Sequence, residues 1–171
     1  SNNFAAIRLV KTLQAEGRGA TPDEQHVLAR YVGWGGIPQE FDKNNEKWAA
    51  EYRELKDALT PDEWQDAFDS TQFAHYTSEN VIGAMYQALA RMGVKGGVRF
   101  LEAGSGVGNF VGLAPQDMLT GSRFTGIERD AISGAIAQYL YPNQSMQVAD
   151  FTRWNAADGT FDVSILEIGD G

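Results

Sequence analysis

The chain has 171 residues, a formal net charge of −9 and no cysteine. The lack of cysteine excludes disulfides, thiolate metal sites and cysteine nucleophiles, and with two histidines no metal centre is expected. Acidic residues outnumber basic ones in both halves, so the chain offers no basic face of the kind that binds nucleic acid. No apolar run reaches the ~18 residues of a membrane span and no signal-peptide pattern opens the chain, so a cytoplasmic protein without membrane contact is expected.

Residues 1–70 predict a helical N-terminal extension. Apolar residues recur at helical spacing from Phe4 to Leu13. Thr-Pro-Asp-Glu occurs at 21–24 and again at 60–63, and each copy combines a cap, a proline at the first helical position and the acid of a capping box. Helices are therefore expected over 4–17, 21–31 and 48–59, and from residue 60 onward.

A loop of unusual backbone shape is expected at 33–38, where three glycines and a proline fall within six residues. Two interpretations stay open. In one, the loop is a tight connection with Trp34 as its hydrophobic anchor. In the other, it contacts a cofactor, a substrate or a partner domain.

From residue 71 onward strands alternate with helices, which predicts a second unit over 71–171. Such alternation is typical of an α/β fold with a parallel sheet, here of about four strands. Ligands in these sheets bind at the carboxyl ends of the strands. The expected strands are 98–102, 123–127, 145–148 and 161–166, and the expected helical stretches are 79–91, 109–119 and 130–139.

A glycine-rich turn follows the first of these strands. Glu102-Ala-Gly-Ser-Gly-Val-Gly108 places an acid ahead of glycines at alternate positions. These glycines allow backbone conformations that a Cβ forbids and let a ligand approach the main chain, while the next helix would favour a negative group. The dinucleotide fingerprint G-x-G-x-x-G requires a small third residue at 109, which is Asn109, so an NAD-binding oxidoreductase is the less favoured alternative.

Two further strand ends carry carboxylates. Glu128 ends the second strand, where a carboxylate can accept both hydrogen bonds of a ribose diol. Asp150 follows the third strand and could accept from an adenine amino group, with Phe151 covering the ring face. The alternatives are a solvated turn residue for Glu128, and a loop aspartate beside a core phenylalanine for the other two.

Hydroxyl side chains precede the helix at 79. Thr77 or Ser78 would cap this helix in any case. Because the helix leads into the first strand, its start could also present a hydroxyl and N–H groups to a carboxylate of the cofactor. We expect His75 to be packed or solvated and not to act as a general base.

Taken together, Tyr76-Thr77-Ser78, the glycine motif, the Glu128 strand end and Asp150-Phe151 occur in the order found in S-adenosylmethionine-dependent N6-adenine DNA methyltransferases, which the chain resembles. Through 30–38 it also resembles the methyltransferase segment of large helicase–methyltransferase proteins of plasmids and phages. The resemblance implies a Rossmann-like class I methyltransferase fold that binds S-adenosyl-L-methionine. The implied cofactor-binding residues are Tyr76, Thr77, Glu102, Gly104, Ser105, Gly106, Gly108, Glu128, Asp150 and Phe151.

One departure from the family pattern concerns the catalytic motif. After the fourth strand such enzymes carry Asn/Asp-Pro-Pro-aromatic, which binds and stacks on a flipped base. Here 167–171 reads Glu-Ile-Gly-Asp-Gly, so the catalytic residue is not identified; Glu167 is nearest in position and could accept a hydrogen bond. We therefore expect a domain truncated after the fourth strand, with DNA bound by regions outside this chain and a helicase domain as a candidate partner. The alternative is a degenerate, inactive module with a structural or interaction role.

Overall fold

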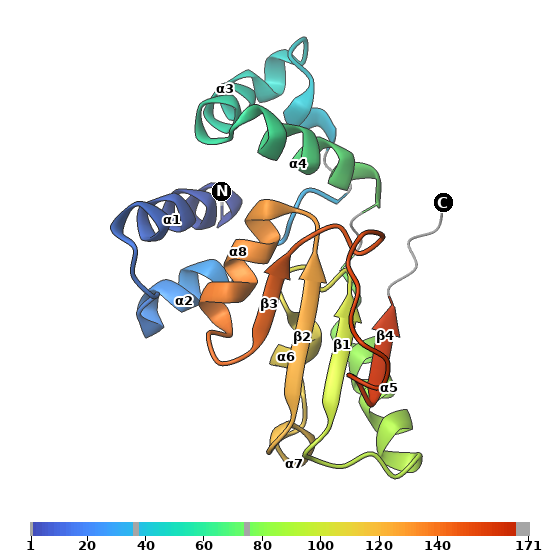
Figure 1. The fold of residues 1–171 in the computed structure, drawn as a ribbon. Coiled ribbons are helices and arrows are strands. Elements are labelled where there is room, and N and C mark those ends of the chain that lie inside the picture. Colours follow the sequence, from blue (N-terminus) through green and yellow to red (C-terminus); the bar gives the residue numbers. More distant parts are fainter. Residues whose placement is uncertain (1, 36–37, 74–75, 167–171) are drawn as a thin grey trace.

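The computed structural model describes residues 2–35, 38–73 and 76–166 (Figure 1). It is an α/β protein with a four-stranded parallel sheet and helices packed against it. No helix in these ranges is long and apolar enough to cross a membrane. The helices are α1 (Asn2–Glu16), α2 (Pro22–Leu28), α3 (Ala49–Ala58), α4 (Pro61–Phe73), α5 (Glu79–Arg91), α6 (Asn109–Gly112), α7 (Gln116–Leu119) and α8 (Ala131–Leu140), with short 3-10 turns η1 (Pro38–Phe41) and η2 (Glu46–Trp48).

The sheet has the strand order β3-β2-β1-β4. In register, Phe100 of β1 lies beside Phe124 of β2 and Val163 of β4. The chain therefore moves outward from β1 and then returns to its other side, which makes the carboxyl ends of β1 and β4 the switch point. This order is compatible with a Rossmann-like arrangement. The predicted parallel sheet is confirmed, with strands β1 (Arg99–Ala103), β2 (Arg123–Glu128), β3 (Ser145–Val148) and β4 (Val163–Leu166).

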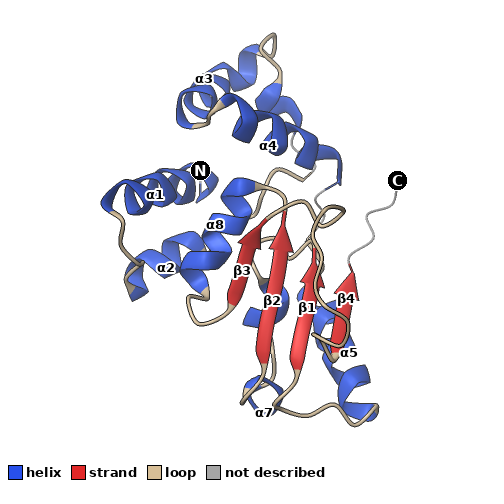
Figure 2. Ribbon diagram, viewed as in Figure 1, coloured by secondary structure: helices blue, strands red, loops and turns tan. Residues whose placement is uncertain are grey.

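The two faces of the sheet are covered differently. On one face, α5, α6 and α8 share an apolar core with the strands. In this core the Phe100 and Phe124 rings stack at 4.5 Å, and Tyr86 of α5 stacks on Phe110 of α6 at 4.3 Å. The loop from β3 to β4 crosses the opposite face, as Figure 2 shows.

The N-terminal helices continue the core of the α/β part. Ile7 of α1 and Leu28 of α2 are fully buried in one cluster with Ile132 and Ile136 of α8. Both predicted capping boxes are present, since Thr21 pairs with Glu24, and Thr60 pairs with Glu63, through reciprocal side-chain and backbone bonds. Packing against α8 therefore stabilises α1 and α2, in addition to the capping signal at the start of α2.

The helix expected at 109–119 is divided. Helix α6 ends at Gly112, and α7 begins only after the extended Pro115, which lacks the amide hydrogen that a continuous helix would use. A single turn carries little aligned dipole. The expectation that this helix favours a negative group at the glycine turn is therefore weakened.

Candidate functional site

The glycine turn follows the carboxyl end of β1 and is hydrogen-bonded to the carboxyl end of β2. Gly104, Gly106 and Gly108 have φ of +76°, +53° and +88°, conformations that side chains with a Cβ rarely adopt. The backbone N–H groups of Gly104 and Ser105 both donate to the carbonyl of Ile127, at 2.8 and 3.2 Å. The predicted need for glycine is confirmed, and the turn lies directly on the second strand.

Glu128 joins the glycine turn to the start of α8. Its Oε2 accepts from the Gly106 N–H at 2.7 Å, and its Oε1 accepts from the Asp130 N–H at 2.8 Å. Burial raises the pKa of Glu128, against the effect of these two bonds. A carboxylate has about four lone-pair positions, so Glu128 keeps capacity to accept from a hydroxyl group of a ligand.

Asp130 extends this network into α8. It caps the helix by accepting from the Ile132 N–H at 3.0 Å, and its other oxygen accepts from the Ser133 hydroxyl at 2.5 Å. Ser133 Oγ lies 3.4 Å from the Tyr76 hydroxyl. Burial raises the pKa of Tyr31, and the negative charge of Asp130 raises it further. The Tyr31 hydroxyl faces Ser133 but makes no hydrogen bond of normal geometry with it.

Sequence reasoning missed Asp130, Ser133 and Tyr31. An aspartate directly ahead of a helix is a capping signal that could have identified Asp130. Tyr31 had no such signal, because its neighbours come from distant segments.

Tyr76, the first residue of the 76–78 step, lies against the glycine turn. A Cβ built on Gly106 would meet the Tyr76 ring at 2.7 Å, which shows how closely the ring contacts the turn. Ser78 is the N-cap of α5 and accepts from the Val81 N–H at 3.4 Å, while Thr77 is half-buried beside it.

A second tyrosine ring occupies the space beside Gly108. A Cβ there would lie 2.6 Å from Cε2 of Tyr141. Gly106 and Gly108 therefore leave room for side chains of the protein itself, where the sequence predicted room for a ligand.

Glu102 and Ser105 are both buried. Glu102 lies in β1 beside Gly126 and Ile165, and its charge adds to burial in raising the pKa of Tyr141. Ser105 Oγ faces Gly126 and has no hydrogen-bond partner within 2–35, 38–73 and 76–166. Both side chains are thus packed inside the protein, Glu102 in the strand ahead of the turn and Ser105 within the turn.

Asp150 is organised by its own turn. Its Oδ1 accepts from the side chain and the backbone N–H of Thr152, at 2.7 and 2.9 Å, and these bonds lower the pKa of Asp150. Oδ2 lies 3.8 Å from Arg153. The carboxylate is partly exposed, so this second oxygen can still accept from a ligand.

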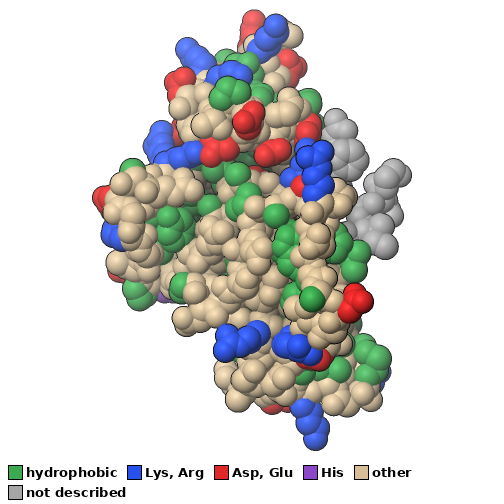
Figure 3. All heavy atoms as spheres, in the orientation of Figure 1, with side chains coloured by type: hydrophobic (Ala, Val, Ile, Leu, Met, Phe, Trp, Pro, Cys, Tyr) green, Lys and Arg blue, Asp and Glu red, His purple; other side chains and the backbone are tan. Residues whose placement is uncertain are grey.

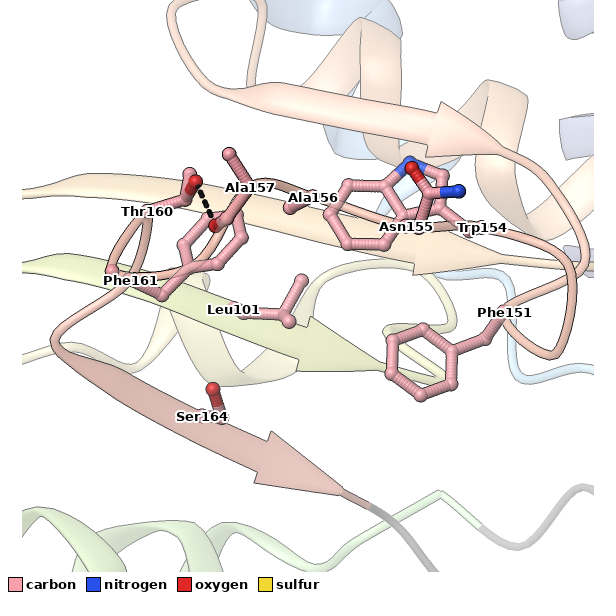
Figure 4. A pocket seen from close by; sticks show the side chains of 10 residues that line it. Leu101, Phe151, Trp154, Asn155, Ala156, Ala157, Thr160, Phe161 and Ser164 are labelled. Atoms are coloured by element: carbon pink, nitrogen blue, oxygen red, sulfur yellow. Dashed lines mark hydrogen bonds between the residues drawn. The ribbon is translucent and has the colours of Figure 1, made fainter.

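A pocket of about 410 Å³ lies under the β3–β4 loop. In Figure 4, Phe151 lies beyond the tip of β1, while Trp154 and Phe161 line the pocket from the β3–β4 loop that crosses the sheet. Phe151 and Trp154 stack at 6.2 Å, and Trp154 Nε1 donates to Gln147 at 3.0 Å. The sequence identified Phe151 but not Trp154, whose contacts depend on the path of the loop.

Two sequence candidates, His75 and Glu167, lie outside the described residues. Within the described part of the chain, no group of three or more His, Cys, Asp or Glu residues could hold a metal ion. On the face drawn in Figure 3, basic side chains are scattered among acidic ones.

The sequence matches no protein-family model, and no curated protein or solved structure is significantly similar to the chain.

Proposed function

We propose that this chain has a Rossmann-like class I methyltransferase fold and binds S-adenosyl-L-methionine. The observation that carries the proposal is that three residues expected from the sequence to bind a cofactor lie together at the carboxyl ends of the strands. They are Tyr76, Gly106 and Glu128. Tyr76 contacts the turn at Gly106, and the Gly106 N–H donates to Glu128. This edge adjoins the topological switch point, where open parallel sheets bind their ligands.

Each part of the cofactor has a group of suitable chemistry. Tyr76, Thr77 and the turn at 104–108 would hold the methionine part. The remaining acceptor capacity of the Glu128 carboxylate would serve the ribose hydroxyls. Asp150 would accept from the adenine amino group through Oδ2, with Phe151 against the ring.

In the larger protein that the resemblance implies, the reaction is methyl transfer from the sulfonium to the exocyclic N6 of a DNA adenine. Such transfer depends on positioning two bound partners and needs no covalent enzyme intermediate. Glu167 is the candidate acceptor for the target amino group. DNA contacts are assigned to regions outside this chain, because its net charge is −9.

Isothermal titration calorimetry with S-adenosylmethionine and S-adenosylhomocysteine tests the proposal. We expect saturable binding of both ligands, and no comparable stabilisation by NAD in a melting assay. Absence of binding at millimolar ligand, or preference for NAD, would overturn it.

A second candidate function is a structural or interaction module within a DNA-processing protein. It is favoured by the tyrosine rings beside Gly106 and Gly108, because packing alone then requires these glycines. This alternative predicts that Gly108→Ala destabilises the fold while the wild-type chain binds no S-adenosylmethionine.

A further inference from the structure

The ring of Tyr76 stands between two glycines that are distant in sequence. A Cβ built on Gly33 would lie 2.6 Å from Cε2 of the ring, and one on Gly106 would lie 2.7 Å from Cε1. Real Cβ atoms essentially never approach another atom so closely. Both positions thus require glycine as long as the ring stays between them.

The backbone at Gly33 is held by the first helix. Asn3 of α1 is buried, and its side-chain amide donates to the Gly33 carbonyl at 2.7 Å. Its amide oxygen accepts from the Val32 N–H at 3.0 Å. The next residue, Trp34, is fully buried and packs edge-on against Phe4. Trp34 is therefore an anchor, as one interpretation of the loop predicted.

On its other side, the Tyr76 ring contacts Gly106, which is hydrogen-bonded to Glu128. Gly106 presents its N–H to Glu128, and the Tyr76 hydroxyl lies 3.4 Å from Ser133. Ser133 in turn donates to Asp130, whose N–H donates to Glu128. The Tyr76 ring thus contacts the glycine turn directly and is also linked to it through the hydrogen-bonded side chains at the start of α8. Gly33 lies against the opposite edge of the same ring.

We propose that Gly33 is a positioning residue of the candidate cofactor site. By leaving room for the Tyr76 ring, it keeps that ring against Gly106 and so keeps the Gly106 N–H on Glu128. Residues 2–35 are then part of the site and not an independent appendage. The inference relies on the proposed function for its ligand, and its structural half can be measured without one.

The test compares Gly33→Ala with Gly17→Ala. Both glycines have positive φ, +71° and +63°, so both variants carry backbone strain. No atom lies within 4 Å of a Cβ on Gly17, so only the first variant pushes against Tyr76. We expect Gly33→Ala to raise the Kd for S-adenosylhomocysteine about tenfold. Gly17→Ala should leave it unchanged.

Hydrogen exchange of the Gly106 amide supplies the ligand-free measurement. In Gly33→Ala this amide should exchange faster, while the Ile136 amide in the middle of α8 should keep its protection. The same Gly106 exchange rate in Gly33→Ala and Gly17→Ala would overturn the positioning role. If the wild-type chain binds no cofactor, the proposed function fails and the exchange rate alone decides this inference.

Removal of the ring provides a rescue test. On the background of Tyr76→Ala, Gly33→Ala should cause no further change in Gly106 exchange or in Kd, because nothing is left to displace. If Gly33→Ala does not fold alone, recovery of folding in the double variant supports the inference. Additive effects, or a double variant that also fails to fold, would contradict it.

Discussion

The two halves of the candidate cofactor site are held in different ways. At the ends of β1 and β2, Glu128 accepts from Gly106 and Asp130, so its position depends on two separate segments. At the end of β3, Asp150 accepts from Thr152 within its own turn, and Phe151 stacks on Trp154 of the same loop. The first half is thus coupled to the whole fold, whereas the second is local. Substitutions in the first half should therefore lower the free energy of unfolding, whereas substitutions in the second half should leave it nearly unchanged.

The largest effect is expected for Glu128→Ala. Its loss leaves the N–H groups of Gly106 and Asp130 without their carboxylate acceptor. We expect the free energy of unfolding to fall by about 2–4 kcal/mol and cofactor affinity to fall about 100-fold. Urea denaturation and calorimetry measure the two quantities. Full stability in Glu128→Ala would contradict the coupling described for this half.

A smaller loss is expected for Asp130→Ala. The variant removes the cap of α8 and the acceptor of Ser133, which should cost about 1–2 kcal/mol of unfolding free energy. Affinity should fall less than in Glu128→Ala, since Asp130 reaches the ligand only through Glu128. Equal losses of affinity in the two variants would show that Asp130 itself binds the ligand.

The local half should lose affinity with little change in stability. We expect Phe151→Ala to weaken cofactor binding about tenfold through lost stacking on adenine. Its unfolding free energy should change by less than about 1 kcal/mol, because Phe151 is half-buried at the pocket edge. Phe161→Ala is the matched control from the other end of the pocket, and its affinity should stay at the wild-type value.

The pH dependence of the coupled half has a defined sign. Burial raises the pKa of Glu128 above the usual 4.5, so the free energy of unfolding gains a protonation-linked part that is present below 4.5 and is lost as pH rises through the raised value. The two backbone hydrogen bonds to the carboxylate are separate from this part and remain above it. Cofactor binding needs the ionised form as acceptor, so affinity should increase over the same range. Because burial also raises the pKa of Asp130, Glu128→Gln serves as the reference. A pH dependence of affinity that is identical in Glu128→Gln would assign it to another group.

The smallest effect is expected far from both halves, at the opposite end of the sheet. Arg99 holds the pKa of Asp162 down to about 2 through a two-pronged ion pair. The stability that this pair contributes is present above the usual 3.8 and is lost as pH falls toward about 2. Asp162→Asn should therefore lower Tm slightly at pH 7 and not at all near pH 2. Thermal melts at the two pH values measure this, and cofactor affinity at pH 7 should be unaffected.

Local patterns were sufficient to predict much of this architecture. Short-range signals predict three features: the capping boxes at Thr21 and Thr60, the four parallel strands, and the place of Glu128 at a strand end. Each depends on residues within a few positions of one another, where capping and periodicity act.

Contacts between distant segments could not be predicted in this way. No short pattern indicates that Tyr76 lies between Gly33 and Gly106, because the fold alone brings these three segments together. The same holds for the contact of Trp154 with Gln147 of β3. The split at Pro115 does have a local signal, because a proline inside a helical stretch removes the amide hydrogen that a continuous helix uses.

The central claim is that S-adenosylmethionine occupies the edge formed by the glycine turn, Glu128 and Asp150. The most direct test is a ¹H–¹⁵N NMR titration of the wild-type chain with S-adenosylhomocysteine. The account predicts saturable shifts concentrated at residues 104–108, 128–130 and 150–151. No shifts at millimolar ligand, or shifts confined to other parts of the molecule, would contradict it.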